Sequence, residues 1–240
     1  MNVLAIDTAT EQVAVAIGLD GEVRGSVTLA GGRRHAEQLA PAIRSLSRET
    51  GVAVSRLTAI AVGIGPGLFT GLRVGVTTAK VMAQALRIPV VGVSSLDLVA
   101  YPLRHASRMV VVVLDARRHE VFHASYVPVP GGVQRVTDDA VGAPEELVAE
   151  LEARGVAVLL AGEGATRFRE AFAELDHVEH AGPAFAYPSV AALVELSTAR
   201  VEREEYETPG ELVPRYLRAS DAELNWVDAA GTDTRAGARS

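Results

Sequence analysis

The apolar residues of this chain fall into short runs separated by glycine, proline and polar residues. Runs over 3–6, 13–19 and 23–29 predict three strands that form a meander. Asp20-Gly21 stands between the second and third runs, and this dipeptide is a strong hairpin signal between alternating strands. The chain therefore is expected to open with an antiparallel sheet.

Helical periodicity first appears at 35–48, where Leu39, Ile43 and Leu46 recur at helical spacing. Pro41 should kink or shorten this helix, because proline has no amide hydrogen and its ring clashes with the preceding turn. Apolar runs and turn residues then predict alternating elements over the rest of the first half: strands over 58–64 and 89–93, and helices over 70–86 and 95–103.

The second half begins again with a strand and repeats the order of elements. The patterns predict strands over 109–114, 119–127 and 156–161, and helices over 144–154, 166–175 and 189–204. Residues 225–240 are small and polar and are expected to be disordered.

The two halves match in the order of their elements. Leu4-Ala5-Ile6-Asp7 and Val112-Val113-Leu114-Asp115 are both apolar strands that end in an aspartate and are followed by a short turn. This weak duplication predicts an α/β chain of two related lobes, each a mixed β-sheet flanked by helices. The expected lobes are 1–104, completed by part of 205–220, and 105–204.

The segment 63–75 contains five glycines and a proline where a strand becomes a helix. Its spacing matches neither the phosphate loop nor the dinucleotide fingerprint, although the helix start near Thr70 could accept an anion. Gly71, Gly75, Ala79 and Ala83 recur every four residues and so lie on one helix face. We interpret this bare face as a contact for another helix, with Val74, Val81 and Leu86 facing the sheet; packing on the chain's own sheet is the alternative.

Composition narrows the possible functions. The chain of 240 residues has no cysteine, which excludes disulfides and thiolate chemistry and fits a reducing cytoplasm. The N-terminus does not resemble a signal peptide, and the longest apolar run is too short to cross a bilayer. A formal charge of −7 argues against autonomous nucleic-acid binding. Basic clusters such as Arg117-Arg118-His119 are interpreted as solvated surface that could supplement a more basic partner.

Three residues could form a nucleotide site between the lobes. Asp7 and Thr8 follow the first strand and Asp115 follows its counterpart, so Asp7 and Asp115 could hold a magnesium-bound phosphate; an ordinary turn is the alternative. Arg117 after Asp115 is too bulky for a close phosphate turn, which weakens a kinase or ATPase function. His119 and His123 stand on a predicted strand, too far apart to share a metal ion.

Several motifs together resemble the bacterial TsaB (YeaZ) family over roughly residues 1–220. They are Asp7-Thr8-Ala9-Thr10, His35 with Pro41, Gly65-Pro66-Gly67-Leu68-Phe69-Thr70-Gly71-Leu72-Arg73, and Pro214-Arg215-Tyr216-Leu217-Arg218. The resemblance implies an actin-like, sugar-kinase-like (ASKHA) duplicated fold. It also implies a role in making threonylcarbamoyladenosine at position 37 of tRNA, with the catalytic paralogue TsaD and the ATPase TsaE as partners.

The resemblance further implies a non-catalytic, dimerising and activating subunit in the cytoplasm. Ser95 and Val99 stand where the paralogue has two metal-binding histidines, so we expect no metal, no catalytic residues and no cofactor of its own. The sequence leaves open whether ADP or ATP binds at the joint with TsaD. It also leaves open the alternative function of an actin-like ATPase or phosphotransferase that uses Asp7 and Asp115. The family has also been labelled as peptidases, but this sequence offers no set of nucleophile and supporting residues for that activity.

In the family, the first two helices pair with TsaD or with a second copy, so we expect a homodimer when the chain is alone and tRNA contact only through the complex. The residues expected at this interface lie on the two helices: Leu39, Ile43, Leu46, Gly71, Leu72, Gly75, Ala79 and Ala83.

Overall fold

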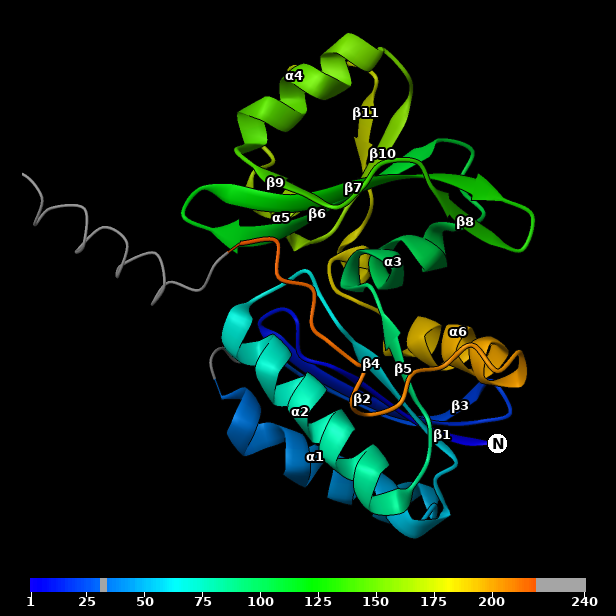
Figure 1. Cartoon of the computed structure of the whole chain (residues 1–240). Helices are drawn as coiled ribbons and strands as arrows, with labels where there is room; N and C mark the ends of the chain where they lie inside the picture. The colour runs from blue at the N-terminus through cyan, green and yellow to red at the C-terminus, as the bar shows by residue number, and fades with distance from the viewer. Residues whose placement is uncertain (31–33, 219–240) are drawn as a thin grey trace, which may run out of the picture.

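A computed structural model describes residues 1–30 and 34–218, and it consists of two mixed β-sheets and three layers of helices. The layers are stacked so that helices cover both faces of each sheet (Figure 1). None of the helices in these two ranges is long and apolar enough to cross a membrane.

The first sheet has the order β3-β2-β1-β4-β5. β1 pairs antiparallel with β2, which pairs antiparallel with β3, while β4 runs parallel to β1 and β5 runs parallel to β4. The predicted hairpin at Asp20-Gly21 is confirmed, with both residues at positive φ. The strands are β1 (Asn2–Asp7), β2 (Gln12–Leu19), β3 (Glu22–Ala30), β4 (Ala59–Gly63) and β5 (Val90–Val93).

The second sheet repeats this arrangement in the order β8-β7-β6-β10-β11, with β9 on the edge of β7. Its pairings have the same directions, antiparallel on the β7 side of β6 and parallel on the β10 side. The duplication predicted from sequence is therefore confirmed. The strands are β6 (Met109–Arg117), β7 (Glu120–Val129), β8 (Gly132–Arg135), β9 (Ala140–Gly142), β10 (Val158–Ala161) and β11 (Val178–His180).

The outer helix layers belong to one lobe each. α1 (His35–Thr50) and α2 (Phe69–Leu86) pack on the outer face of the first sheet. α4 (Pro144–Arg154) and α5 (Glu163–Arg167) cover the outer face of the second. Three short 3₁₀ turns, Val54–Arg56, Tyr101–Leu103 and Pro183–Phe185, complete the regular structure of the described ranges.

The middle layer consists of α3 (Ser95–Ala100) and α6 (Val190–Glu202), and both helices cross the expected lobe boundaries. Leu96 and Val99 of α3 pack on the second sheet, although the chain preceding α3 builds the first. α6 covers the first sheet, and a Cβ at Gly18 of β2 would lie 2.3 Å from a methyl group of Val194 on α6. The expected assignment of 105–204 to one lobe therefore separates α6 from the sheet on which it packs.

The C-terminal segment returns to the first lobe after α6. Glu207 pairs with Val90 of β5, and the amide of Arg215 donates to the carbonyl of Ile64. Leu212 is buried in the core beneath α1 and α2. The tail predicted over 225–240 lies outside the described residues.

Two local predictions need correction. Pro41 does not shorten α1, which continues through it to Thr50, and Pro41 is exposed, so the carbonyl that loses its helical partner is on the solvent side. The helix expected over 166–175 instead begins at Glu163 and ends at Arg167, and turns follow it.

Candidate functional site

The two aspartates singled out in the sequence form the same turn in each lobe. Asp7 accepts a hydrogen bond from the amide of Ala9 at 3.1 Å, and Asp115 accepts one from the amide of Arg117 at 2.9 Å. Each carboxylate thus holds the turn that follows its central strand. This local role is the ordinary-turn alternative, and it is present in both halves of the duplication.

Asp7 is buried beneath the first lobe's glycine-rich turn. Its second oxygen accepts a hydrogen bond from Ser95 at 3.2 Å, and a Cβ at Gly63 would lie 1.8 Å from it. Burial raises the pKa of the Asp7 carboxyl to about 7, while the hydrogen bonds from Ala9 and Ser95 act in the opposite direction. Asp7 therefore joins β1 to the start of α3 and has no room for a phosphate.

Thr8 is held against α2. Its hydroxyl donates to the carbonyl of Gly71 at 2.8 Å. A Cβ at Gly71 would lie 2.1 Å from the Thr8 carbonyl oxygen, and one at Gly75 would lie 2.3 Å from the Thr8 hydroxyl. The glycines let α2 press against the turn between β1 and β2, so close packing explains their density.

This packing overturns the interpretation of the small-residue face. Gly71, Gly75, Ala79 and Ala83 face the chain's own lobe, and Val81, which was assigned to the sheet side, is 59% exposed. A row of small residues permits close approach to any neighbour, and here that neighbour is the β1–β2 turn and the sheet. The eight residues expected at a partner interface are all buried within the chain: Leu39, Ile43, Leu46, Gly71, Leu72, Gly75, Ala79 and Ala83.

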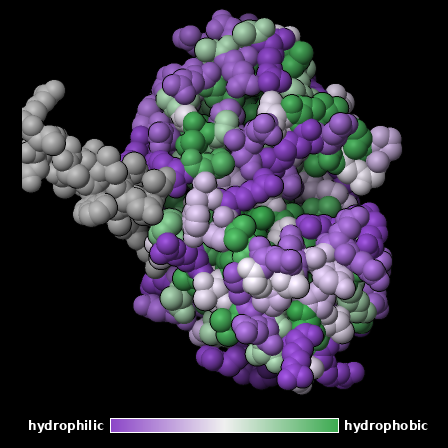
Figure 2. Space-filling view, viewed as in Figure 1, coloured by the Kyte–Doolittle hydropathy of each residue, from purple (hydrophilic) through white to green (hydrophobic). Residues whose placement is uncertain are grey.

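The outward faces of the same two helices are lined by different residues. On α2 the exposed positions that recur at helical spacing include Thr70, Arg73, Thr77, Val81 and Gln84. On α1 they include Glu37, Ala40, Pro41, Arg44 and Arg48. We call these ten residues the outer helix surface. Figure 2 shows neutral and pale residues among hydrophilic ones over this lower lobe.

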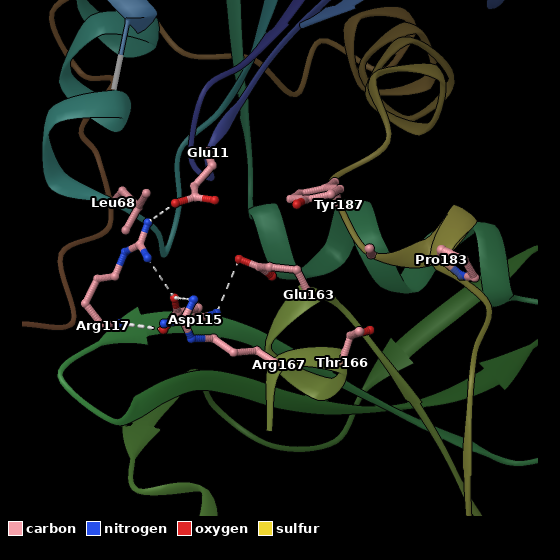
Figure 3. A pocket seen from close by; sticks show the side chains of 10 residues that line it. Glu11, Leu68, Asp115, Arg117, Glu163, Thr166, Arg167, Pro183 and Tyr187 are labelled. Atoms are coloured by element: carbon pink, nitrogen blue, oxygen red, sulfur yellow. Dashed lines mark hydrogen bonds and ion pairs between the residues drawn. The ribbon is translucent and has the colours of Figure 1, made fainter. Parts of the chain in front are cut away.

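A cavity of about 370 Å³ lies between the lobes (Figure 3). The β1–β2 turn contributes Glu11 and the start of α2 contributes Leu68, while the second lobe contributes the remaining walls. Those second-lobe residues are Asp115, Arg117, Glu163, Thr166, Arg167, Pro183, Ala186 and Tyr187. Asp7 and Thr8 do not line it, so the three expected nucleotide residues are not brought together.

An ion-pair network spans this cavity. Arg117 pairs with Glu11 of the first lobe and, at 3.2 Å, with Asp115 of its own lobe (Figure 3). Arg167 approaches Asp115 at 3.5 Å. Arg117 reaches across from a turn in which three consecutive residues, 117–119, have positive φ. Its guanidinium bonds to both lobes at the position where they meet.

Glu163 is the most perturbed group of the cavity. Its carboxylate accepts hydrogen bonds from the amides of Asp115 and Gly164 at 3.3 and 3.2 Å. Burial nevertheless raises its pKa to about 8, so the group is mostly protonated at neutral pH. Glu163 was not predicted as a site residue from the sequence; the turn Gly162-Glu163-Gly164 is the local signal that could have pointed to it.

These residues do not fit a magnesium–nucleotide complex of the actin-like type. Asp7 is enclosed and does not line the cavity between the lobes, and Asp115 is engaged by two arginines. In residues 1–30 and 34–218, Asp7 and Asp115 are therefore not assembled into the phosphate site that the alternative function as an ATPase or phosphotransferase would need.

Metal-binding groups are not brought together either. Ser95 is enclosed with Asp7, and Val99 packs in the core above α3. His119 lies 2.9 Å from Glu145, and His123 lies on β7. Within residues 1–30 and 34–218, no group of three or more histidines and carboxylates is placed to hold a metal ion.

A second exposed cluster lies where the C-terminal segment runs along α2. The Arg73 guanidinium lies 3.9 Å from the Phe69 ring centroid, and Phe69 and Tyr216 have ring centroids 5.0 Å apart. Further along, Lys80 donates to the carbonyl of Leu212 at 2.9 Å. The motif at 214–218 was noted in the sequence, but its position beside α2 depends on a contact between distant segments.

Comparison with known proteins identifies relatives. Residues 22–226 match the family model described as "TsaD: tRNA N6-adenosine threonylcarbamoyltransferase". The chain is 30% identical to the tRNA threonylcarbamoyladenosine biosynthesis protein TsaB of Bacillus subtilis, over 95% of this chain and 99% of that protein.

Solved structures agree with this relationship. YeaZ from Pseudomonas aeruginosa superposes with a TM-score of 0.78 at 31% identity, over 90% of this chain and 99% of that one. An activator of 2-hydroxyisocaproyl-CoA dehydratase from Clostridium difficile gives a TM-score of 0.52 at 12% identity, over 91% of this chain and 100% of that one. That likeness shows the fold alone, and the predicted ASKHA-like architecture is confirmed.

Proposed function

Because the chain belongs to the TsaB (YeaZ) family, we propose that it takes part in tRNA threonylcarbamoyladenosine biosynthesis as a non-catalytic subunit that binds and activates a TsaD-type transferase. The biosynthetic pathway in this proposal comes from the names of the relatives, which are threonylcarbamoyladenosine biosynthesis proteins. The non-catalytic role is supported by the enclosed Asp7 and by the side chains of Ser95 and Val99, which pack in the interior.

The outer helix surface is the contact that we propose for TsaD. The observation that carries this assignment is the exposure of Val81, at 59%, within a row of exposed positions on α2. Thr77, Ala40 and Pro41 of the same surface are uncharged, so this part of the surface loses little hydration when another helix pair covers it, while Glu37, Arg44, Arg48 and Arg73 supply charge around it. When the chain is alone, a second copy would use the same surface, giving a homodimer.

The remaining partners follow from the same proposal. TsaE would act as the ATPase of the cytoplasmic complex, and tRNA would be modified at position 37 in the TsaD subunit. An adenine nucleotide at the joint with TsaD is part of this proposal and requires that TsaD complete the site.

The test is co-purification with TsaD after a charge is placed on the surface. Val81→Glu should lower affinity at least tenfold, because it buries an unpaired carboxylate in the contact. Val156→Glu is the matched control, since Val156 is a valine 45% exposed on the second lobe. Equal affinity of both variants for TsaD would refute the assigned surface.

A reconstituted modification reaction tests the function itself. Product formation by TsaD and TsaE should stop or slow sharply when this chain is omitted. Undiminished product without the chain would refute the activating role.

A further inference from the structure

The described part of the chain ends beside the first-lobe wall of the interlobe cavity. Tyr216 contacts Phe69, with ring centroids 5.0 Å apart, and Phe69 directly follows the cavity residue Leu68. In Figure 1 the orange C-terminal segment passes the start of α2 and ends beside the second sheet. The chain therefore reaches the cavity just before residue 219.

The last described residue also contacts the second-lobe side of the same cavity. Arg218 pairs with Glu120 at 2.6 Å, and Glu120 begins the strand that follows the turn of Arg117. Arg117 lines the cavity. Residues 219–240, which lie outside the described ranges, thus continue from a point next to both walls.

The sequence beyond this point is small and polar except for one short stretch. Within residues 219–240 the large apolar side chains are Leu224, Trp226 and Val227, and we call these three residues the apolar tail cluster. Trp226 is the only tryptophan of the chain. An indole ring has a large apolar surface to remove from water, so this cluster is the part of the tail that gains most from a binding site.

The walls of the cavity suit an indole ring (Figure 3). Leu68, Pro183, Ala186 and Tyr187 provide apolar and planar surfaces. Arg167, whose side chain is 57% exposed, provides a guanidinium, and tryptophan is the aromatic residue that binds a cation best. The volume of about 370 Å³ is in the range of pockets that enclose a small organic molecule, about 300–1,000 Å³.

The charges of the cavity favour a neutral occupant. Arg117 and Arg167 are matched by Glu11 and Asp115, and burial keeps Glu163 largely protonated. An anionic ligand would have to break these ion pairs, whereas a neutral ring leaves them in place. The carboxylates also offer acceptors for the indole N–H, the one polar group that a buried tryptophan side chain must satisfy.

The length of the connection allows this contact. Trp226 follows Arg218 by eight residues, and an extended chain covers at most about 3.6 Å per residue, so the ring reaches up to about 29 Å from Arg218. A short tether also gives the cluster an effective concentration in the millimolar range at the cavity. The chain's own tail therefore has an advantage over the tail of a second copy.

We propose that the apolar tail cluster folds back into the interlobe cavity of its own chain and places the Trp226 ring between walls from both lobes. The contact ties the lobes together and excludes small molecules from the cavity. The expected disorder of the tail then applies only to residues 228–240. Neither TsaD nor the outer helix surface takes part, so this contact does not depend on the proposed function.

Tryptophan fluorescence of the full chain tests the contact, because it reports on Trp226 alone. The emission should lie at shorter wavelength than that of a peptide of residues 219–240, and acrylamide should quench it less. Ala186→Phe fills the cavity and should return both properties to those of the peptide. Ala184→Phe is the matched control, because Ala184 is exposed two residues away and does not line the cavity.

A disulfide gives an independent measurement in a chain that has no cysteine. Thr166 lines the cavity, so Thr166→Cys with Val227→Cys should form an intramolecular disulfide under mild oxidation. Thr166→Cys with Thr234→Cys is the control and should react more slowly, because position 234 lies beyond the cluster. This measurement decides the question if Ala186→Phe does not fold.

Peptide-like emission from the folded unmodified chain would overturn the inference, as would equal rates of disulfide formation at positions 227 and 234. Shielded emission that persists in folded Ala186→Phe would place the ring outside the cavity and would also overturn it. Disulfides that join two chains would assign the cluster to the cavity of a second copy, against the intramolecular contact.

Discussion

Replacing Gly75 with alanine tests whether α2 is pressed against the β1–β2 turn. The new Cβ would lie 2.3 Å from the Thr8 hydroxyl, whereas its next neighbours, the Thr8 Cβ and an Ile6 methyl, would lie at 3.5 and 3.7 Å. Overpacking of this kind costs about 1–3 kcal/mol. Alanine in a helix recovers about 1 kcal/mol relative to glycine. The variant should therefore lose about 0–2 kcal/mol of unfolding free energy.

In a chain that already carries Thr8→Ala, the effect of Gly75→Ala on the free energy of unfolding should change sign. As a single substitution, Thr8→Ala removes the hydrogen bond to Gly71 and should lower the free energy of unfolding by about 0.5–1.5 kcal/mol. In its background Gly75→Ala meets no atom closer than an ordinary contact and should stabilise by up to about 1 kcal/mol. The resulting coupling energy is about 1–3 kcal/mol. Thr8→Ser is the matched control, because it keeps the hydroxyl and so should keep the clash.

Urea denaturation followed by circular dichroism gives the four free energies of this double-mutant cycle. Effects that add within about 0.5 kcal/mol would refute the steric argument. Because Gly75 is buried, binding of the folded variant to TsaD should equal that of the unmodified chain. A selective loss of TsaD binding would restore the original interpretation of the small-residue face.

Three further predictions concern stability. The folded-state pKa of Asp7, about 7, lies above its unfolded value, so its contribution to stability is full below pH 4 and is lost as pH rises toward 7. Thermal denaturation across this range should show a shallower decline for Asp7→Asn, and parallel curves would contradict the assignment. Gly162→Ala should destabilise by more than 2 kcal/mol in urea, because its Cβ would lie 2.1 Å from a β6 carbonyl oxygen. Gly131→Ala, also at positive φ but with nothing within 4 Å, should cost about 1 kcal/mol, and equal losses would exclude the clash. Ser189→Ala removes the N-cap of α6 and should cost about 1 kcal/mol of unfolding free energy; an unchanged midpoint would show that the cap contributes nothing.

The order of the main helices and strands and the duplication of the fold could both be predicted from the sequence. Strands such as β1 and β6 have strong apolar runs and end in the same aspartate turn, so local patterns identify them. β8, β9 and β11 are three or four residues long and lack the continuous apolar run that marks the equally short β5 and β10, so no local pattern identifies them.

The candidate site was less predictable, because its contacts join residues far apart in the chain. The direction in which the Gly71–Gly75 face points depends on Thr8, which is 63 residues from Gly71. Arg117 and Glu11 are 106 residues apart in the chain, and no local sequence pattern predicts that they form an ion pair. Spacing identified which residues share a helix face, but it could not show which neighbour that face meets.

The crossed middle helices have a consequence for dividing the protein. A fragment ending near residue 104 would keep α3 but lose α6, so the inner face of its sheet would be open, with Val3, Ala5 and Val91 exposed to water. The complementary fragment would carry α6 without the sheet on which it packs. Neither half is a self-sufficient module, and the two should become soluble only when produced together, as a split protein whose halves exchange one helix each.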